Sequence, residues 1–311
     1  MNQHITLREV GLRDGLQIVK TIVDTSTKLQ WIAAEHAAGV SEIEVCSLVP
    51  PRLIPQFADA AEVIGSALQV RGLTVSALIP NLKGAQRGVD LGVHKMNYAM
   101  SVSESHNLAN VRRSVAESLE DFRNIVSMLR GVPEIRRPKL SGGLSTSFGC
   151  TIEGAVSEDR VVELAVVLAE AGADELVIAD TVGYGGPAAI GRVFARILKA
   201  VDNVPVIAHF HDTRGLGIAN AAAALSVGVR YFDATLAGLG GCPHAPGATG
   251  NVVMEDLAFL CETMGFDTGV DIPKLVQVRE LLTLALPQER LAGAIAVAGL
   301  PKNFTATAPT A

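Results

Sequence analysis

The chain has 311 residues, of which 49% are hydrophobic, 19% charged and 4% aromatic. This composition excludes a largely disordered chain, because it supplies ample apolar side chains for an α/β core. The formal net charge of −6 gives no attraction to a nucleic acid backbone, and no run of Lys and Arg is interleaved with aromatic residues, so nucleic acid partners are not expected.

The termini and the hydropathy of the chain predict a cytoplasmic protein. No basic segment leads into an apolar one at the start of the sequence, so a secretory signal is not indicated. No run of about eighteen apolar residues is free of charge, so no membrane contact is expected. The four cysteines, Cys46, Cys150, Cys242 and Cys261, form no C-x-x-C pair, which in a reducing compartment favours free thiols.

Short apolar or alternating runs recur along the chain and predict eight strands. In chain order they span residues 5–10, 42–48, 73–79, 95–99, 140–148, 175–179, 204–211 and 231–236. Segments of helix length separate them. One carries an apolar stripe from Ile190 to Leu198 and another a stripe from Leu108 to Val126, both with helical spacing.

Strict alternation of strand and helix implies parallel strands joined by right-handed crossovers. Eight such units close naturally into a (β/α)8 TIM barrel, which is the fold we predict. A doubly wound open sheet is the alternative. Against it, none of the glycine clusters spells G-x-G-x-x-G between a strand and a helix, and no G-K-[ST] phosphate loop is present.

The sequence predicts one catalytic barrel with a short extension. Residues 1–268 are expected to form the barrel, and residues 269–303 a C-terminal helical segment packed on it. The Pro-, Thr- and Ala-containing tail, residues 304–311, is expected to be disordered.

Two histidines, His209 and His211, end the seventh predicted strand. Because side chains alternate along a strand, both imidazoles lie on one face, and two adjacent imidazoles suit a divalent metal. The pair also lies where strands run into loops, which is where reactive groups gather in such barrels. A pair of hydrogen-bonded structural histidines is the alternative interpretation.

Oxygen ligands for such a metal are available on neighbouring strand ends. Asp14 follows the first strand and Asn251 follows the eighth, and these strands become adjacent when a barrel closes. A mixed nitrogen and oxygen set with open positions favours Mg²⁺ or Mn²⁺ over Zn²⁺. Taken alone, Asn251 is better explained as the N-cap of the helix that follows, and Asp14 lies in an Arg-Asp-Gly sequence typical of a surface turn.

Two further carboxylates lie on predicted strands or at their ends. Glu44 lies on the polar face of the second strand, where an unpaired carboxylate inside a barrel is costly, and Arg13 is the partner we expect. Asp180 follows the sixth strand and either takes part in catalysis or caps the next turn. Gln17, Ser47 and Thr181 are expected to contact the substrate.

Cys242 lies in a stretch so rich in glycine and proline that it must be a loop. Long glycine-bearing loops over barrel mouths often act as lids, so this thiol is expected to close over the site. The alternative for a single cysteine is a small buried hydrophobe, which fits Cys261 in its helical setting better than it fits Cys242.

Three segments resemble those of 3-hydroxy-3-methylglutaryl-CoA lyases, which are metal-dependent TIM-barrel enzymes. They are residues 8–17 (REVGLRDGLQ), 209–215 (HFHDTRG) and 238–251 (GLGGCPHAPGATGN), within a resemblance that runs from about residue 7 to 268. The resemblance implies metal ligands at Asp14, His209, His211 and Asn251, catalytic residues at Arg13 and Glu44, and a mobile-loop thiol at Cys242.

By this resemblance the substrate is an acyl-CoA, cleaved by a retro-Claisen (retro-aldol) step to acetyl-CoA and acetoacetate, a reaction of leucine degradation and ketone-body formation. A homodimer or higher homo-oligomer is expected. Leu12 stands where the lyases usually have proline, and Ile18-Val19 and residues 97–107 also differ, so a related ester such as citramalyl-CoA is an alternative substrate. A non-catalytic metal- or acyl-CoA-binding barrel is the alternative from another class.

The expected mechanism assigns one step to each group. His209 or Asp14 takes the proton of the substrate hydroxyl, with the metal lowering its pKa. Arg13, held by Glu44, stabilises the thioester enolate that cleavage expels. Cys242 then protonates the enolate carbon.

Overall fold

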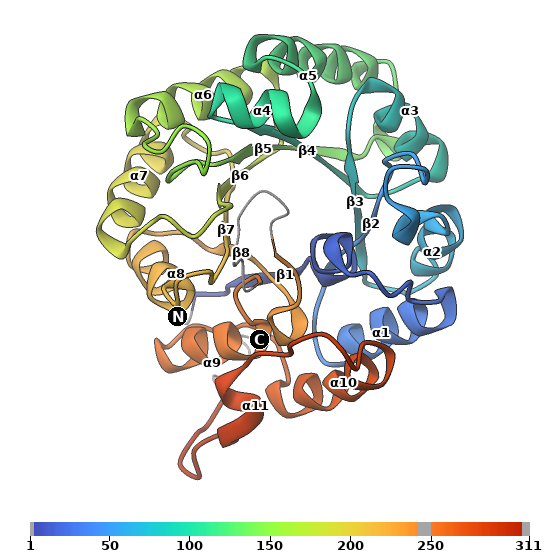
Figure 1. The fold of residues 1–311 in the computed structure, drawn as a ribbon, viewed down its shortest axis with the longest axis vertical. Coiled ribbons are helices and arrows are strands. Elements are labelled where there is room, and N and C mark those ends of the chain that lie inside the picture. The colour runs from blue at the N-terminus through green and yellow to red at the C-terminus, as the bar shows by residue number, and fades with distance from the viewer. Residues whose placement is uncertain (1–2, 242–249, 307–311) are drawn as a thin grey trace.

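The computed structural model describes residues 3–241 and 250–306. Eight parallel strands form a closed barrel in chain order, with β1 hydrogen-bonded to both β2 and β8 (Figure 1). The strands are β1 (Thr6–Glu9), β2 (Glu42–Ser47), β3 (Thr74–Ile79), β4 (Lys95–Ser101), β5 (Lys139–Ser145), β6 (Glu175–Asp180), β7 (Val206–Phe210) and β8 (Tyr231–Ala234). The predicted (β/α)8 barrel is confirmed, and the doubly wound alternative is wrong.

Helices form a ring around the barrel, as Figure 1 shows. Each helix buries an apolar stripe against the strands, because apolar residues with a 3.6-residue period gather on one face of a helix. They are α1 (Thr25–Ala37), α2 (Ala60–Ala67), α3 (Leu82–Leu91), α5 (Val115–Arg130), α6 (Glu158–Ala171), α7 (Pro187–Ala200), α8 (Gly217–Ser226) and α9 (Met254–Thr263). None of the helices in the described parts of the chain is long and apolar enough to cross a membrane.

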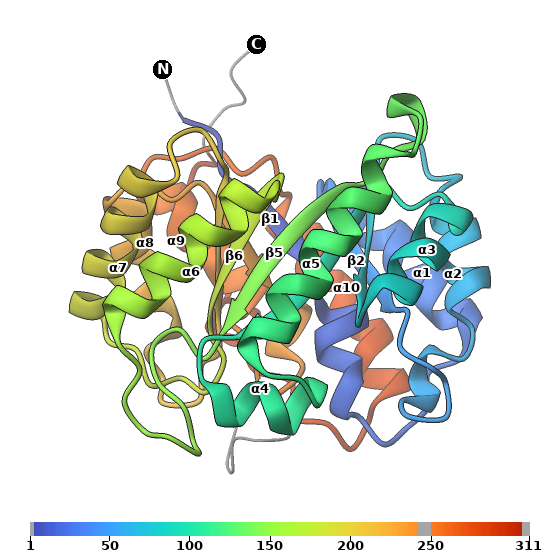
Figure 2. The same cartoon turned by 90° about the horizontal axis from the view of Figure 1, so that it is seen from above.

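The predicted stripe from Leu108 to Val126 belongs to two helices rather than one. The short helix α4 (Glu104–Val111) ends at Arg112, whose backbone is left-handed with a φ of 57°. Ser114 then begins α5 with a capping box to Glu117, a signal that is present in the sequence. Figure 2 shows α4 at the end of the barrel where the strands finish, so this extra helix borders the mouth.

The strand bounds also differ from those predicted. The fifth strand ends at Ser145, because Thr146 adopts a positive φ of 58° and turns the chain, whereas the apolar pattern extended the prediction to residue 148. The seventh strand spans Val206–Phe210, so His211 lies one residue beyond it. These shifts move loop residues to the mouth without changing the order of the strands.

Two C-terminal helices pack outside the barrel. Helix α10 (Ile272–Ala285) lies against α1 and α9, and α11 (Ala294–Ala298) lies against α9. The ring of Phe304 lies 5.4 Å from that of Phe259 on α9, centroid to centroid. Residues 307–311 of the predicted disordered tail lie outside the described residues, and the division at residue 268 stays a prediction.

Ion pairs fill the barrel interior beneath the mouth. Arg8 is buried and lies 2.7 Å from Asp233 and 3.4 Å from Glu175, between charged atoms. Lys95 lies 2.7 Å from Glu175 and 2.6 Å from Glu42. Buried charges are tolerated only when paired, so this network forms a rigid polar floor under the functional site.

Candidate metal centre and active site

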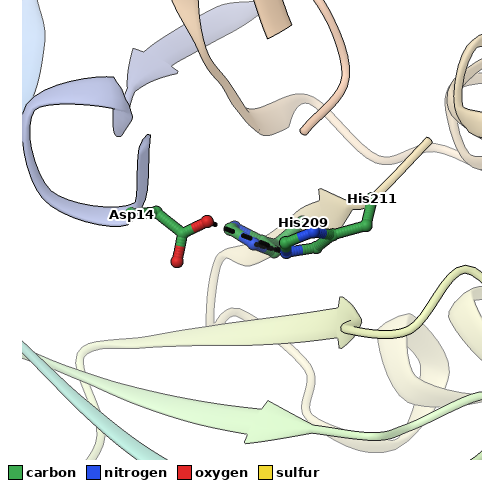
Figure 3. A group of neighbouring side chains, drawn as sticks. All are labelled: Asp14, His209 and His211. Carbon is green, nitrogen blue, oxygen red and sulfur yellow. Dashed lines mark hydrogen bonds and ion pairs between the residues drawn. The ribbon is translucent and has the colours of Figure 1, made fainter. Parts of the chain in front are cut away.

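The two histidines of the seventh strand lie at the barrel mouth with their rings side by side. His209 is 5% exposed and His211 is 4% exposed, and their Nε2 atoms lie 3.2 Å apart. The two-residue spacing places both rings on one side of the chain at the end of β7, where His209 lies on the strand and His211 one residue beyond it. Figure 3 shows the rings pointing toward the carboxylate of Asp14.

Asp14 reaches this point from a tight turn after β1. The turn, Gly11–Gly15, is a single π-helical turn, and it places one carboxylate oxygen of Asp14 3.7 Å from Nε2 of His211. One ligand atom from each of Asp14, His209 and His211 lies within 4.8 Å of the others. The surface-turn alternative for Asp14 is therefore wrong, because the turn faces the barrel mouth.

Asn251 joins this group from the segment after β8. Its amide nitrogen donates to Oδ2 of Asp14 at 2.7 Å, and its backbone forms a bridge with that of His211. The N-cap of α9 is Val253, whose side chain makes no capping hydrogen bond. The capping alternative for Asn251 is therefore wrong, and closure of β1 against β8 brings together the four residues expected to surround a metal.

Asp233 on β8 orients His209. The two residues are register partners, and Nδ1 of His209 donates to Oδ2 of Asp233 at 3.0 Å. This contact leaves the lone pair of His209 on Nε2, the atom that faces His211, an arrangement common behind metal-bound histidines. Burial lowers the pKa of His209, but the bond to Asp233 more than offsets this and the net shift is upward.

Among the described residues, Nδ1 of His211 has no hydrogen-bond partner comparable to Asp233. Burial lowers the pKa of His211 to about 4, so the ring is neutral near pH 7 and its nitrogen is available as a ligand. For Asp14, burial acts to raise the pKa, but Arg13 and the two histidines outweigh it and hold the carboxyl well below its ordinary range. The neutral imidazole of His211 and the ionised carboxylate of Asp14 are donors that fit a divalent ion, and His209 can join them in its neutral form.

Arg13 and Glu44 lie beside the metal candidates. Nε of Arg13 pairs with one oxygen of Glu44, and Nη1 of Arg13 lies 2.6 Å from Oδ1 of Asp14. Glu44 is 1% exposed. The expected pairing of Glu44 with Arg13 is thus present, and the guanidinium is held between two carboxylates at the mouth.

Asn97 on β4 is a site residue that the sequence reasoning missed. Its amide nitrogen donates to Oε1 of Glu44 at 2.7 Å, on the opposite oxygen from Arg13. Asp233 was also missed. The available signal was alternation, because Asn97 and Asp233 are polar residues at inward positions of predicted strands.

Other predicted residues lie further from this group. Asp180 accepts hydrogen bonds from the backbone N–H groups of Tyr184 and Gly185 at 2.9 and 3.0 Å, so its carboxylate holds its own loop. Ser47 is fully buried, and its hydroxyl accepts from the N–H of Val49 at 3.3 Å. These contacts favour structural roles for both residues.

A cavity of about 610 Å³ opens above the group, a size suited to a small acyl ligand. Gln17 and Thr181 line it, whereas Ser47 and Asp180 do not, and contact of Gln17 and Thr181 with a substrate stays a prediction. Gly241 lines it as well, and Cys242, the next residue, lies outside the described residues. The cavity wall near the ligand candidates is formed by Arg13, Asp14, Glu44, Asn97, His209 and His211.

Fold and site together define a (β/α)8 barrel with a His–His–Asp group at the ends of its strands. The chain belongs to the HMGL-like family, whose model matches residues 4–282. It is 36% identical over 291 residues to a hydroxymethylglutaryl-CoA lyase of Bacillus subtilis, covering 92% of this chain and 96% of that protein. It is also 36% identical over 304 residues to an (R)-citramalyl-CoA lyase of Chloroflexus aurantiacus, covering 93% and 94%.

A solved structure supports the same family assignment. An HMG-CoA lyase from Acinetobacter baumannii, in complex with coenzyme A and 3-methylmalate, superposes with a TM-score of 0.90. The two sequences are 38% identical, and the match covers 97% of each chain. The family resemblance expected from the sequence is confirmed.

Proposed function

We propose that this chain is a divalent-metal-dependent carbon–carbon lyase that cleaves 3-hydroxy-3-methylglutaryl-CoA to acetyl-CoA and acetoacetate. The observation that carries the proposal is the group of Asp14, His209 and His211 beside the Arg13–Glu44 pair, at the mouth of a barrel related to such lyases over nine tenths of its length. We assign Asn251 as the fourth ligand and Mg²⁺ or Mn²⁺ as the ion.

A divalent ion held there would lower the pKa of the substrate's tertiary hydroxyl and ease the loss of its proton. The protein supplies two candidate acceptors for that proton. The pKa of Asp14 lies well below its ordinary range, whereas that of His209 is raised by Asp233 against the effect of burial. His209 can accept the proton only while its Nε2 does not bind the ion, because a metal-bound Nε2 has no free lone pair, whereas Asp14 can bind the ion through one oxygen and accept the proton on the other.

Loss of the proton turns the hydroxyl into a ketone and breaks the adjacent carbon–carbon bond, whose electrons form the thioester enolate. Arg13 is placed to stabilise the enolate oxygen, because Glu44 and Asp14 fix its guanidinium at the cavity wall. Burial acts to lower the pKa of Arg13, but the two carboxylates outweigh it and keep the group charged. Cys242 donates the proton that converts the enolate to acetyl-CoA.

The acyl-CoA class of substrate is supported by positive charge at the cavity. Arg52, Arg112 and Arg113 line it, and Arg52 and Arg112 are exposed, so both can meet the phosphates of CoA. A homodimer or higher oligomer is also proposed, and light scattering coupled to gel filtration would test it, with a monomer at micromolar concentration contradicting it. Cytoplasmic location and a role in leucine degradation stay predictions.

Citramalyl-CoA is the second candidate substrate, because a lyase for that thioester is as similar to this chain as the Bacillus enzyme is. The two candidates are separated by measuring acetyl-CoA formation from both thioesters, after chelation and after adding back Mg²⁺ or Mn²⁺. We expect metal-dependent turnover with 3-hydroxy-3-methylglutaryl-CoA preferred. Faster cleavage of citramalyl-CoA would favour the second candidate, and no turnover of either would favour the non-catalytic barrel.

The matched control for this assay is a histidine away from the mouth. His211→Ala should abolish metal-dependent turnover, because it removes one of two nitrogen ligands. His4→Ala should not, because His4 is exposed near the N-terminus and pairs with Asp267. Equal activity of the two variants would contradict the assigned site.

A further inference from the structure

Three carboxyl side chains are fully buried behind the metal candidates. Glu9 ends β1, Glu35 lies on α1 and Glu255 lies in the first turn of α9, and each is 0% exposed. The mechanism proposed above uses none of them. Burying an ionised carboxyl group is costly unless the group is paired with a cation or protonated, so the charge state of these three groups has to be explained.

Glu9 connects the two loops that carry the metal candidates. One of its carboxylate oxygens accepts a hydrogen bond from the N–H of Gly11, and the other accepts one from the N–H of Leu236 at 2.9 Å. Gly11 begins the turn that holds Arg13 and Asp14. Leu236 begins the segment that runs from β8 toward Asn251, so one carboxylate ties both loops together from beneath.

The turn at Gly11 has no space for a side chain at this contact. A Cβ added to Gly11 would lie 2.9 Å from the ring of Trp31 and would overlap the Glu9 carboxylate. The close approach of the Gly11 N–H to Glu9 therefore depends on glycine at this position. This packing shows that Glu9 is enclosed on the side that faces α1.

Glu35 lies on α1 within reach of Glu9 and of the buried indole N–H of Trp31. Within the described residues, no backbone N–H group and no cation pairs with its carboxyl group. Burial, and then the neighbouring Glu9, raises the pKa of Glu35 well above its ordinary value. Two touching carboxylates without a cation cannot both stay ionised in a protein interior.

The other charges that face this pair do not supply the missing cation. Glu255 accepts from the N–H of Ala237 at 3.0 Å and pairs with Arg279 of α10 at 2.6 Å. The positive charge of Arg279 is thus offset by Glu255. Burial raises the pKa of Glu9 as well, but the hydrogen bonds from Glu35 and from the N–H groups of Gly11 and Leu236 lower it, so Glu9 is the better anion of the pair and Glu35 the better acid.

We propose that Glu9 and Glu35 hold at least one proton between them at neutral pH, and that the Glu9 carboxyl group kept in place by this proton is a positioning residue for the two loops of the metal site. The first statement concerns the fold alone. The second rests on the proposed function, because the residues it positions are the candidate ligands.

The proton has a signature in the pH dependence of stability. The folded chain retains a proton that the unfolded chain releases above an ordinary glutamate pKa of 4.5. The contribution of this pair to the free energy of unfolding is therefore complete below about pH 4.5. It decreases as the pH rises toward the raised pKa of the pair in the folded chain. Relative to Glu35→Gln, the unfolding equilibrium constant of the natural chain should increase by up to about tenfold per pH unit over that range.

Urea unfolding at several pH values from 5 to 8 measures this ratio. Glu62→Gln is the matched control, because Glu62 is an exposed glutamate of α2 and its ratio to the natural chain should not change with pH. A flat ratio for Glu35→Gln would overturn the shared proton. If Glu35→Gln does not fold, Glu35→Leu takes its place, because it also removes the acid.

Infrared spectroscopy reports the proton directly. The carbonyl band of a protonated carboxylic acid should be present at pH 7.5 in the natural chain, weaker in Glu35→Gln and unchanged in Glu62→Gln. No difference between the natural chain and Glu35→Gln would show that Glu35 is ionised, and would overturn the proposal. Neither this measurement nor the unfolding ratio depends on lyase activity.

Metal binding tests the positioning role. Glu9→Gln replaces one acceptor oxygen with an amide that faces an N–H group, so Mn²⁺ affinity should fall by about tenfold or more. Glu35→Gln keeps a donor to Glu9, so its Mn²⁺ affinity should lie closer to that of the natural chain. The Mn²⁺ affinity of Glu62→Gln should equal that of the natural chain. Unchanged affinity in a folded Glu9→Gln variant would overturn this role, whereas a natural chain that binds no Mn²⁺ would contradict the proposed function and leave the proton test standing.

Discussion

Glu44 is held from both sides by different residues. Arg13 pairs with one of its oxygens, and Asn97 donates to the other at 2.7 Å. Asn97→Leu removes a hydrogen bond to a charged group, which is worth about 1.5–3 kcal/mol. We expect kcat/KM to fall by about ten- to a hundredfold, because Glu44 no longer fixes Arg13.

The same variant should leave Mn²⁺ affinity unchanged, because Asn97 contacts none of the candidate ligands. Asn97→Ser retains a donor of shorter reach and should recover part of the loss. Steady-state kinetics and a Mn²⁺ titration of both variants check this. Normal turnover in Asn97→Leu would show that Arg13 needs no support from β4.

The cysteines divide by burial. Cys46, Cys150 and Cys261 are buried thiols, and burial raises the pKa of Cys261 to about 12 and that of Cys46 further. None of these three thiols is among the described residues that line the cavity, so none can reach a substrate held there. The role of proton donor therefore stays with Cys242, which the sequence indicated and which lies outside the described residues.

Cys242→Ser should reduce turnover by at least about a hundredfold, a typical size for losing a general acid. Mn²⁺ binding should stay intact, because no ligand is removed. Cys261→Ala is the control, since Cys261 is enclosed in α9 and touches no part of the cavity. Near-normal activity of Cys242→Ser would remove the thiol from the mechanism.

At the scale of single elements, the site depends on where strands end. The H-x-H pattern predicted two rings on one face of the seventh strand, and the structure has them side by side at the end of β7, with His211 one residue beyond the strand. The partners behind them were harder to predict. The pairing of His209 with Asp233 depends on the register between β7 and β8. The pairing of Asn97 with Glu44 depends on the registers of β2 and β4 with β3, which lies between them. A local sequence pattern specifies neither register.

Asn251 illustrates the same limit. Its position before a helix made capping the stronger interpretation in isolation, yet α9 begins at Met254 and Asn251 bonds to Asp14. Asn251→Ala should therefore lower Mn²⁺ affinity by about ten- to a hundredfold while leaving the helical circular dichroism signal unchanged. An unchanged titration together with a loss of helix signal would restore the capping interpretation.

At the scale of the whole molecule, closure of the barrel is what assembles the site. Asp14 and Asn251 are 237 positions apart and become hydrogen-bonded because β1 pairs with β8. Alternation of strands and helices was sufficient to predict this closure, and with it the meeting of the four candidate ligands. The buried pair Glu9–Glu35 was not predictable, because it depends on how α1 packs against the end of β1.

The most direct test of the account is an anomalous diffraction map of crystals soaked in Mn²⁺. The account predicts one strong manganese peak between Nε2 of His209, Nε2 of His211 and the carboxylate of Asp14, within ligand distance of all three. A peak elsewhere in the barrel, or no peak in crystals of an enzyme that Mn²⁺ activates, would contradict the assignment of this group as the metal centre.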